Sequence, residues 1–137
     1  MVELSTGIVD PVAASSLAAV EAPIDVTHLA RMTLGDANLE REVLQLYDRQ
    51  AELLLARMRQ VTPIAAAAYA HTLKGSSSGI GAFKVARAAE AVEFAATTNA
   101  EADVAAAISH LGTAISEARA VIAKLLRLPV QNSPRAG

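Results

Sequence analysis

The chain has 137 residues, a length typical of one domain with a single core. Apolar residues make up 53% of it and aromatic residues only 3%. This balance favours helices, because strands are rich in β-branched and aromatic residues. A net charge of −2, without a cluster of Lys or Arg, argues against a nucleic-acid partner. The absence of cysteine excludes disulfides, thiol chemistry and cysteine-ligated zinc.

The sequence has no feature typical of membrane or secreted proteins. Its longest fully apolar run, residues 64–70, is far shorter than the roughly 20 residues that span a bilayer. The N-terminus carries Glu3 and Asp10 and lacks the basic stretch of a secretory signal. We therefore expect a cytoplasmic protein without a membrane partner.

Both ends of the sequence are predicted to lie outside the folded domain. Residues 1–23 lack sustained periodicity and contain Pro11 and Pro23, so we expect a flexible N-terminal segment. Residues 129–137 contain two prolines and a glycine, and we expect a flexible C-terminal tail. The domain itself is then predicted to span residues 24–128.

The first two predicted helices are a short one and a long one. The short helix covers about residues 26–32 and ends near Gly35. Asp36 is a suitable N-cap for the long helix, which runs to about residue 60. The apolar residues of the long helix recur at helical spacing, and we assign them to the core: Leu39, Val43, Leu46, Tyr47, Leu54 and Val61.

The next two helices are predicted from a capping pair and from periodicity. Thr62 as N-cap and Pro63 at the first helical position open a helix that ends around residues 79–81. A helical wheel places the following residues on its core side: Ala66, Tyr69, Leu73 and Ile80. A further helix covers about residues 82–97, with these residues facing inward: Val85, Ala88, Ala89, Val92 and Ala96.

The last predicted helix begins after Asn99 and reaches about residue 127. Its apolar residues alternate by four and three, the spacing of a left-handed bundle: Val104, Ile108, Leu111, Ile115, Ala118, Ile122 and Leu125. Short connections imply antiparallel neighbours. We therefore predict an all-α fold, an up-down antiparallel four-helix bundle with a short N-terminal helix capping one end. No apolar stripe is left over after this bundle is built, so we expect a monomer.

One histidine is predicted to face outward among small residues. His71 has Lys74 at i+3 and Gly75 at i+4, and these positions share one helix face. A glycine inside a helix costs roughly 1 kcal/mol relative to alanine, a cost that an alanine-rich chain could have avoided. We interpret the space beside His71 as access for a large partner. Such a face suits a phosphoryl group on imidazole, because the lysine offsets the added negative charge.

The alternatives at these and other polar residues are less specific. His71 by itself could be a solvated surface side chain, as most helical histidines are. We expect His28 to be a surface or capping residue and His110 to be solvated. No Glu-x-x-His pair occurs, so a metal site in the bundle core is not expected. Ser76 and Ser77 are interpreted as close-packing residues, since no base is placed to activate them.

The string from His71 to Ser78, His-Thr-Leu-Lys-Gly-Ser-Ser-Ser, is followed by Gly81-Ala82. This pattern resembles the signature of histidine-containing phosphotransfer (HPt) domains, the shuttle modules of bacterial multistep phosphorelays. The resemblance extends from about residue 24 to residue 126, and only the tails lie outside it. It implies that His71 is phosphorylated on Nε2 by exchange with aspartates of receiver domains.

The resemblance also implies roles for three neighbouring residues. Lys74 would stabilise the phosphoryl group, and Gly75 would keep the approach open. Glu93, in the following helix, would accept a hydrogen bond from Nδ1 of the imidazole and leave Nε2 as the nucleophile. A solvated or ion-paired Glu93 is the alternative, and Glu90 would replace it if the register of the helix is shifted by one turn. Phe83 and Phe94 are expected to pack under the short helix or the N-terminal segment, or else to edge a docking surface.

The function implied is a phosphocarrier of two-component signalling, without a kinase or ATPase domain, since no ATP-binding pattern occurs. Its partners would be response-regulator receiver domains and a sensor histidine kinase, hybrid kinases included. No cofactor is expected on this chain, and any Mg²⁺ would belong to the receiver. Two alternatives stay open: an adaptor bundle that binds a receiver or a partner helix without carrying phosphate, and the excised phosphotransfer domain of a larger histidine kinase.

Overall fold

The computed structural model of the chain describes residues 22–98 and 100–128. Every regular element in these ranges is a helix: α3 (Val26–Met32), α4 (Ala37–Met58), α5 (Pro63–Ile80), α6 (Phe83–Ala96) and α7 (Glu101–Arg127). The predicted all-α class is confirmed. The flexibility predicted for the two ends falls outside the described residues, apart from Ala22 and Pro23.

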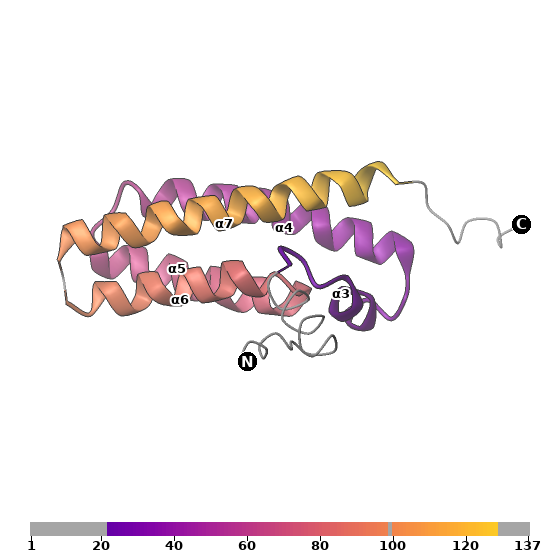
Figure 1. Cartoon of the computed structure of the whole chain (residues 1–137), viewed down its shortest axis with the longest axis horizontal. Helices are drawn as coiled ribbons and strands as arrows, with labels where there is room; N and C mark the ends of the chain where they lie inside the picture. Colours follow the sequence, from indigo (N-terminus) through magenta and orange to yellow (C-terminus); the bar gives the residue numbers. More distant parts are fainter. Residues whose placement is uncertain (1–21, 99, 129–137) are drawn as a thin grey trace, which may run out of the picture.

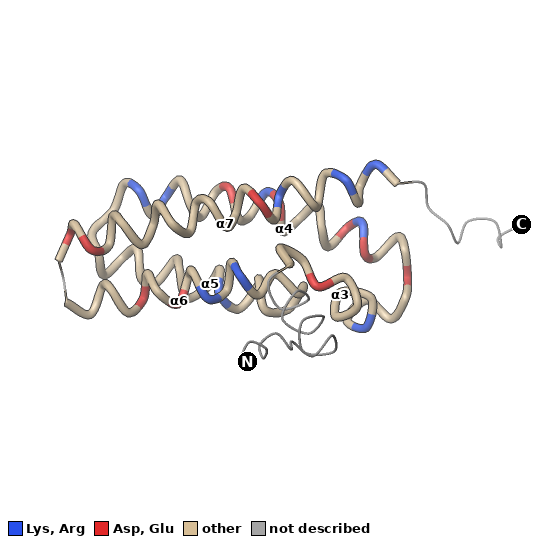
Figure 2. The backbone as a smooth tube through the Cα atoms, in the orientation of Figure 1, with Lys and Arg blue, Asp and Glu red and all other residues tan. Residues whose placement is uncertain are grey.

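The four longer helices lie side by side as a helical bundle, with α3 near one end (Figure 1). α4 packs against α5 and α7, and α6 packs against the same two helices, which closes a ring of contacts. α3 packs against α5. Basic and acidic residues are interspersed along the described helices (Figure 2). No helix in the described ranges combines the length and the apolarity that a bilayer span needs.

Side chains cap the starts of the first three described helices, and the sequence predicts the caps of the second and third. The capping residues each accept a hydrogen bond from a backbone N–H three residues later: Asp25 for α3, Asp36 for α4 and Thr62 for α5. Pro63 follows Thr62 at the first helical position, where its missing N–H costs nothing.

Gly81 ends α5 and holds the chain segment that leads into α3. Its φ of 88° lies in the left-handed region, which favours glycine. The carbonyl of Gly81 accepts the backbone N–H of Asp25 at 2.8 Å. A Cβ on Gly81 would lie 2.7 Å from the carbonyl oxygen of Asp25. Conformation and close approach therefore both require glycine here.

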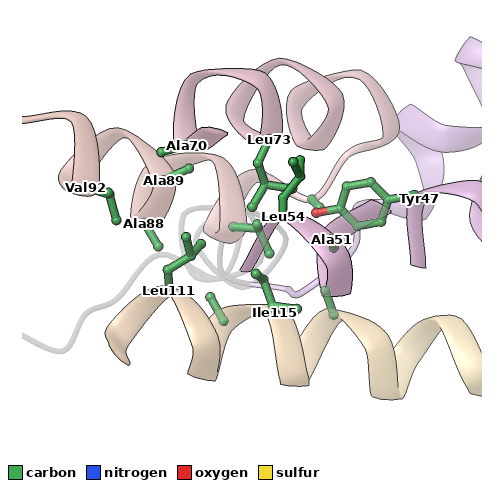
Figure 3. Close-up of a cluster of buried hydrophobic side chains, with 14 of the residues drawn as sticks. Tyr47, Ala51, Leu54, Ala70, Leu73, Ala88, Ala89, Val92, Leu111 and Ile115 are labelled. Carbon is green, nitrogen blue, oxygen red and sulfur yellow. The ribbon is translucent and has the colours of Figure 1, made fainter. Parts of the chain in front are cut away.

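The core along the bundle is built largely as predicted in three helices (Figure 3). In α6 all the residues assigned to the core are buried: Val85, Ala88, Ala89, Val92 and Ala96. In α7 the predicted residues are buried as well, except that Leu125 is only partly buried. In α5 Ala66, Leu73 and Ile80 are buried and Tyr69 is partly buried.

The predicted core face of α4 is wrong in part. Tyr47 and Leu54 are buried, but Leu39 and Leu46 are 39% and 59% exposed. Val61 lies beyond the end of the helix and is also exposed. The buried residues of α4 are Leu44, Tyr47, Ala51, Leu54 and Met58. The prediction merged two apolar lines of one helix, and periodicity does not say which of two such lines is covered.

The core contains a polar pair that joins α4 to α5. The hydroxyl oxygens of Tyr47 and Ser77 lie 2.6 Å apart, and both side chains are buried. Burial raises the pKa of Tyr47 to about 12, although the Ser77 contact lowers it in part. Because each hydroxyl satisfies the other, the pair can lie in the core without an unpaired polar group.

Candidate phosphotransfer site

His71 projects from the side of α5 that faces away from the core. Its side chain is 71% exposed, whereas Ala70 and Leu73 next to it are buried. Gly75, one turn further on, is also exposed, and a Cβ there would meet no heavy atom within 4 Å. The inner face of α5 packs against the bundle, whereas the imidazole on the outer face is accessible to a partner of macromolecular size.

Glu93 of α6 connects His71 to Lys74. Its Oε2 lies 2.8 Å from Nδ1 of His71, and its Oε1 lies 2.8 Å from Nζ of Lys74. Val92, the residue before Glu93, is buried in the core and sets the rotation of α6 against α5. One carboxylate thus bridges two side chains that lie one helical turn apart on α5.

The charges in this group reinforce one another. Partial burial raises the pKa of Glu93, but the contacts with Lys74 and His71 outweigh it, so the pKa lies below its ordinary value. The Glu93 carboxylate in turn raises the pKa of Lys74 above its ordinary value. Both groups are therefore charged at neutral pH. Since a carboxylate has no hydrogen to donate, the hydrogen in the contact belongs to Nδ1 of His71, and the lone pair of a neutral ring is on Nε2.

Lys74 is the residue whose position the sequence predicted least completely. The sequence indicates a lysine near a phosphoryl group, but not its ion pair with Glu93. Detecting that pair requires the relative rotation of α5 and α6, which no local pattern reports. The ammonium has three hydrogens, so the contact with Glu93 leaves donors for other oxygen atoms. A groove beside it is lined by residues of α5 and α6 that include Gly75 and Phe83.

The structure separates the other candidates from this group. Glu90, the alternative to Glu93, is exposed and acts on Lys74 only through its charge. His110 is exposed on α7, as expected. Among residues 22–98 and 100–128, no group of three or more His, Asp or Glu side chains is arranged to hold a metal ion.

The expectations for three side chains need correction, namely His28, Phe94 and Ser76. His28 is half-buried rather than at the surface, and its ring meets Phe83 edge-on with centroids 5.1 Å apart. The cap of α3 is Asp25, to which His28 contributes only its backbone N–H. Phe94 is 74% exposed, so it does not pack under α3 or another described segment, and residues 1–21 of the N-terminal segment lie outside the described residues. Ser76 is also not closely packed: it is partly exposed and donates to the carbonyl of Thr72.

Comparison with protein families matches the Hpt domain over residues 37–121. This range exceeds half of the sequence and includes α4, α5, α6 and most of α7. The chain therefore belongs to the Hpt domain family, as the motif around His71 predicts. Hpt domains are helical phosphocarrier modules of phosphorelay signalling rather than kinase or ATPase domains. No curated protein and no solved structure matches the chain.

Proposed function

We propose that the chain carries phosphoryl groups on His71 between aspartates of receiver domains. The observation that supports this most directly is the exposed imidazole whose Nδ1 contacts the Glu93 carboxylate at 2.8 Å. A surface histidine without a role has no need of a carboxylate that fixes its tautomer. An adaptor that binds a receiver without accepting phosphate would not need it either.

The transfer is a displacement at phosphorus. The lone pair on Nε2 of His71 attacks the phosphorus of a receiver's aspartyl phosphate. An N–P bond forms while the P–O bond to the aspartate breaks, and the aspartate leaves as a carboxylate with that electron pair. The ring keeps its hydrogen on Nδ1 and becomes positively charged, so no base has to remove a proton. Glu93 stabilises the imidazolium, and the reverse reaction delivers the group to a second receiver.

Lys74 and Gly75 complete the proposed site from the same face of α5. The ammonium of Lys74 stabilises the phosphoryl oxygens, because its contact with Glu93 leaves two of its hydrogens for other acceptors. Gly75 leaves the approach to His71 open, since it has no side chain and no heavy atom lies near its Cβ position. Neither role requires a cofactor on this chain, and Mg²⁺ enters with the acidic site of the receiver.

The proposal includes partners, location and architecture. The partners are response-regulator receiver domains and a sensor histidine kinase, hybrid kinases included, in the cytoplasm. The chain itself acts as a carrier without kinase or ATPase activity. We assign the phosphotransfer domain to residues 24–128 with an up-down antiparallel order of α4 to α7. The closed ring of helix contacts and the short connections support that order.

The test is transfer from a labelled phospho-receiver to the wild type, to His71→Gln and to His110→Gln. The third protein is a matched control, because His110 is also an exposed helical histidine. We expect acid-labile, base-stable label on the wild type and on His110→Gln, and none on His71→Gln. Label that persists in His71→Gln, or a wild type that no receiver of a representative panel labels, would refute the proposal.

A further inference from the structure

A line of leucines lies on the outer surface of α4. Leu39, Leu46 and Leu53 are 39%, 59% and 50% exposed. They are seven residues apart, so they lie on one face of the helix. We call these three residues the α4 stripe. Contiguous exposed apolar residues often mark an interface. The sequence-based expectation of a monomer depended on placing Leu39 and Leu46 in the core. Because both are exposed, the reason for expecting a monomer no longer holds.

The surface next to the α4 stripe is also suited to a helix. Val43 and Gln50 lie beside it and are partly buried. Together with Leu46 they line a groove whose other wall is formed by Ser76 and Ile80 of α5. The apolar surface is therefore wider than one row of leucines. It lies along α4, whereas the His71 group is built between α5 and α6.

Two opposite charges lie on the other side of the stripe, one before and one after Leu46. Glu42 and Arg49 are both exposed and are themselves seven residues apart. Glu42 lies four residues before Leu46 and Arg49 three residues after it. Neither has an ion-pair partner among the residues that the structure describes. Their opposite signs on either side of Leu46 make this edge complementary to its own inverted copy.

We propose that the α4 stripe binds the α4 stripe of a second copy of this chain, with the two helices antiparallel around Leu46. Leu46 then meets Leu46 of the second copy, and Leu39 meets Leu53. In an antiparallel pair the same edges of the two helices face each other, so Glu42 lies opposite Arg49 of the second copy, and the reverse. A parallel pair would instead place the edge with Glu42 and Arg49 opposite the edge with Val43 and Gln50 of the second copy, where neither charge meets an opposite one. The charges therefore select both the occupant and its direction.

The contact is a reversible one. Stable interfaces bury roughly 1,200–2,000 Å², and three leucines per copy with their flanking residues supply less than that. We therefore expect a monomer–dimer equilibrium that depends on protein concentration. This inference does not rest on the proposed phosphotransfer, because the stripe and its charges lie outside the His71 group.

Sedimentation equilibrium of the full chain over a range of concentrations tests the association. The wild type should show a concentration-dependent dimer, and Leu46→Glu should remain monomeric, because two carboxylates would meet at the symmetry axis. Ile64→Glu is the matched control: Ile64 is 75% exposed but lies on α5, so this variant should associate like the wild type. Circular dichroism checks that each variant is folded.

A charge exchange tests the direction. Glu42→Arg and Arg49→Glu should each weaken the dimer by about tenfold or more, since each places like charges opposite one another. The double variant E42R/R49E should restore it. Because the chain has no cysteine, a disulfide can also report the register. A mixture of Leu39→Cys and Leu53→Cys should cross-link much faster than either variant alone.

Two results would overturn the proposal. The first is a wild type that stays monomeric at every concentration. If Leu46→Glu then also impairs transfer from a phospho-receiver, the α4 stripe is assigned to a receiver instead of a second copy. The second is a double variant E42R/R49E that associates no better than the single variants.

Discussion

The two faces of α5 differ in nearly every property that a helix surface can have. The inner face is closed: Leu73 is fully buried, and Ser77 is buried with its hydroxyl against that of Tyr47. The outer face is open, with an exposed His71 and with Gly75 free of near neighbours. This contrast teaches that stability and chemistry are separated within one helix. The rigid inner face holds the backbone still, so that the outer face can be left uncovered.

Glycine is present at positions 75 and 81 for two different reasons. Gly81 is required by the fold, because its φ is 88° and a Cβ would collide with the carbonyl of Asp25. Gly75 is not required by the fold, since a side chain there would point into open space. A helix interior disfavours glycine, so the reason for Gly75 lies outside the folded monomer. Access of a partner to His71 is such a reason.

The largest expected effect is on the inner face. Leu73→Ala should lower the free energy of unfolding by roughly 2–5 kcal/mol, because it removes a fully buried side chain and leaves a cavity. Thr72→Ala, at the exposed neighbouring position, should change that free energy by no more than about 0.5 kcal/mol. Urea unfolding followed by circular dichroism measures both. Equal losses in the two variants would mean that α5 does not separate its faces in this way.

On the outer face, substitutions of Gly75 should reduce transfer without reducing stability. Gly75→Gln should slow phosphoryl transfer by about tenfold or more, because its side chain crowds the approach to His71. Gly75→Ala should slow it less, and it should raise the free energy of unfolding by up to about 1 kcal/mol. Rapid-quench transfer assays and urea unfolding give the two quantities. An unchanged transfer rate in Gly75→Gln would refute the access argument.

Glu93 of α6 contacts the outer face of α5 through His71 and Lys74, and its removal should also slow transfer. Glu93→Ala should slow transfer by roughly tenfold, because Nδ1 loses its acceptor and the imidazolium loses a nearby negative charge. Glu93→Gln should retain part of the rate, since an amide oxygen can still accept from Nδ1. Glu90→Ala is the matched control on α6 and should transfer normally. If Glu93→Ala also transfers normally, the tautomer-fixing role is wrong.

The same carboxylate should leave a signature in the pH dependence of stability. Its pKa is lower in the folded chain than its ordinary value of 4.5, so the unfolded chain binds more protons in that region. Its contribution is therefore present above about pH 4.5 and is lost as the pH falls through the folded pKa. Between pH 7 and pH 3, urea unfolding should show that the free energy of unfolding falls less for Glu93→Gln than for the wild type.

The sequence predicts the ends of α5 well because they depend on local chemistry. Thr62, Pro63 and Gly81 act through their own backbone geometry, so they are recognisable in isolation. Which side of α4 is buried does not depend on local sequence, because Leu46 and Leu54 are equally apolar and only packing buries one of them. The ion-pair partners of charged side chains cannot be read from local sequence either, because they come from other helices.

One member of the Tyr47–Ser77 pair can be recognised from the sequence, and the other cannot. The buried residues of α5 recur at the spacing of one helix face, and Ser77 belongs to that series: Ala66, Ala70, Leu73, Ser77 and Ile80. A serine in a core series indicates a polar partner in the core, because an unpaired hydroxyl there is costly. Tyr47 is the partner, but choosing it requires the height of α4 along the bundle, which the sequence does not report.

The smallest effect is expected from this pair. Tyr47→Phe should lower the free energy of unfolding by about 1 kcal/mol, since it leaves the Ser77 hydroxyl buried without a partner. Ser77→Ala should have a similar cost, and the double variant should cost less than the sum, because no polar group is then left unpaired. Urea unfolding of the four proteins gives the coupling energy. Strict additivity would show that the two hydroxyls do not depend on each other.

Alkaline pH provides an independent check on the same pair. Because the pKa of Tyr47 is raised from 10.0 to about 12, the folded chain keeps a proton that the unfolded chain loses. The stabilising contribution is complete below pH 10 and is lost as the pH rises through the folded pKa, with a slope of at most roughly 1.4 kcal/mol per pH unit. Tyr47→Phe lacks this group, so its stability should fall less steeply than that of the wild type above pH 10. Transfer through His71 at neutral pH should remain unchanged in this variant, because the Tyr47 hydroxyl contacts only the inner face of α5, at Ser77.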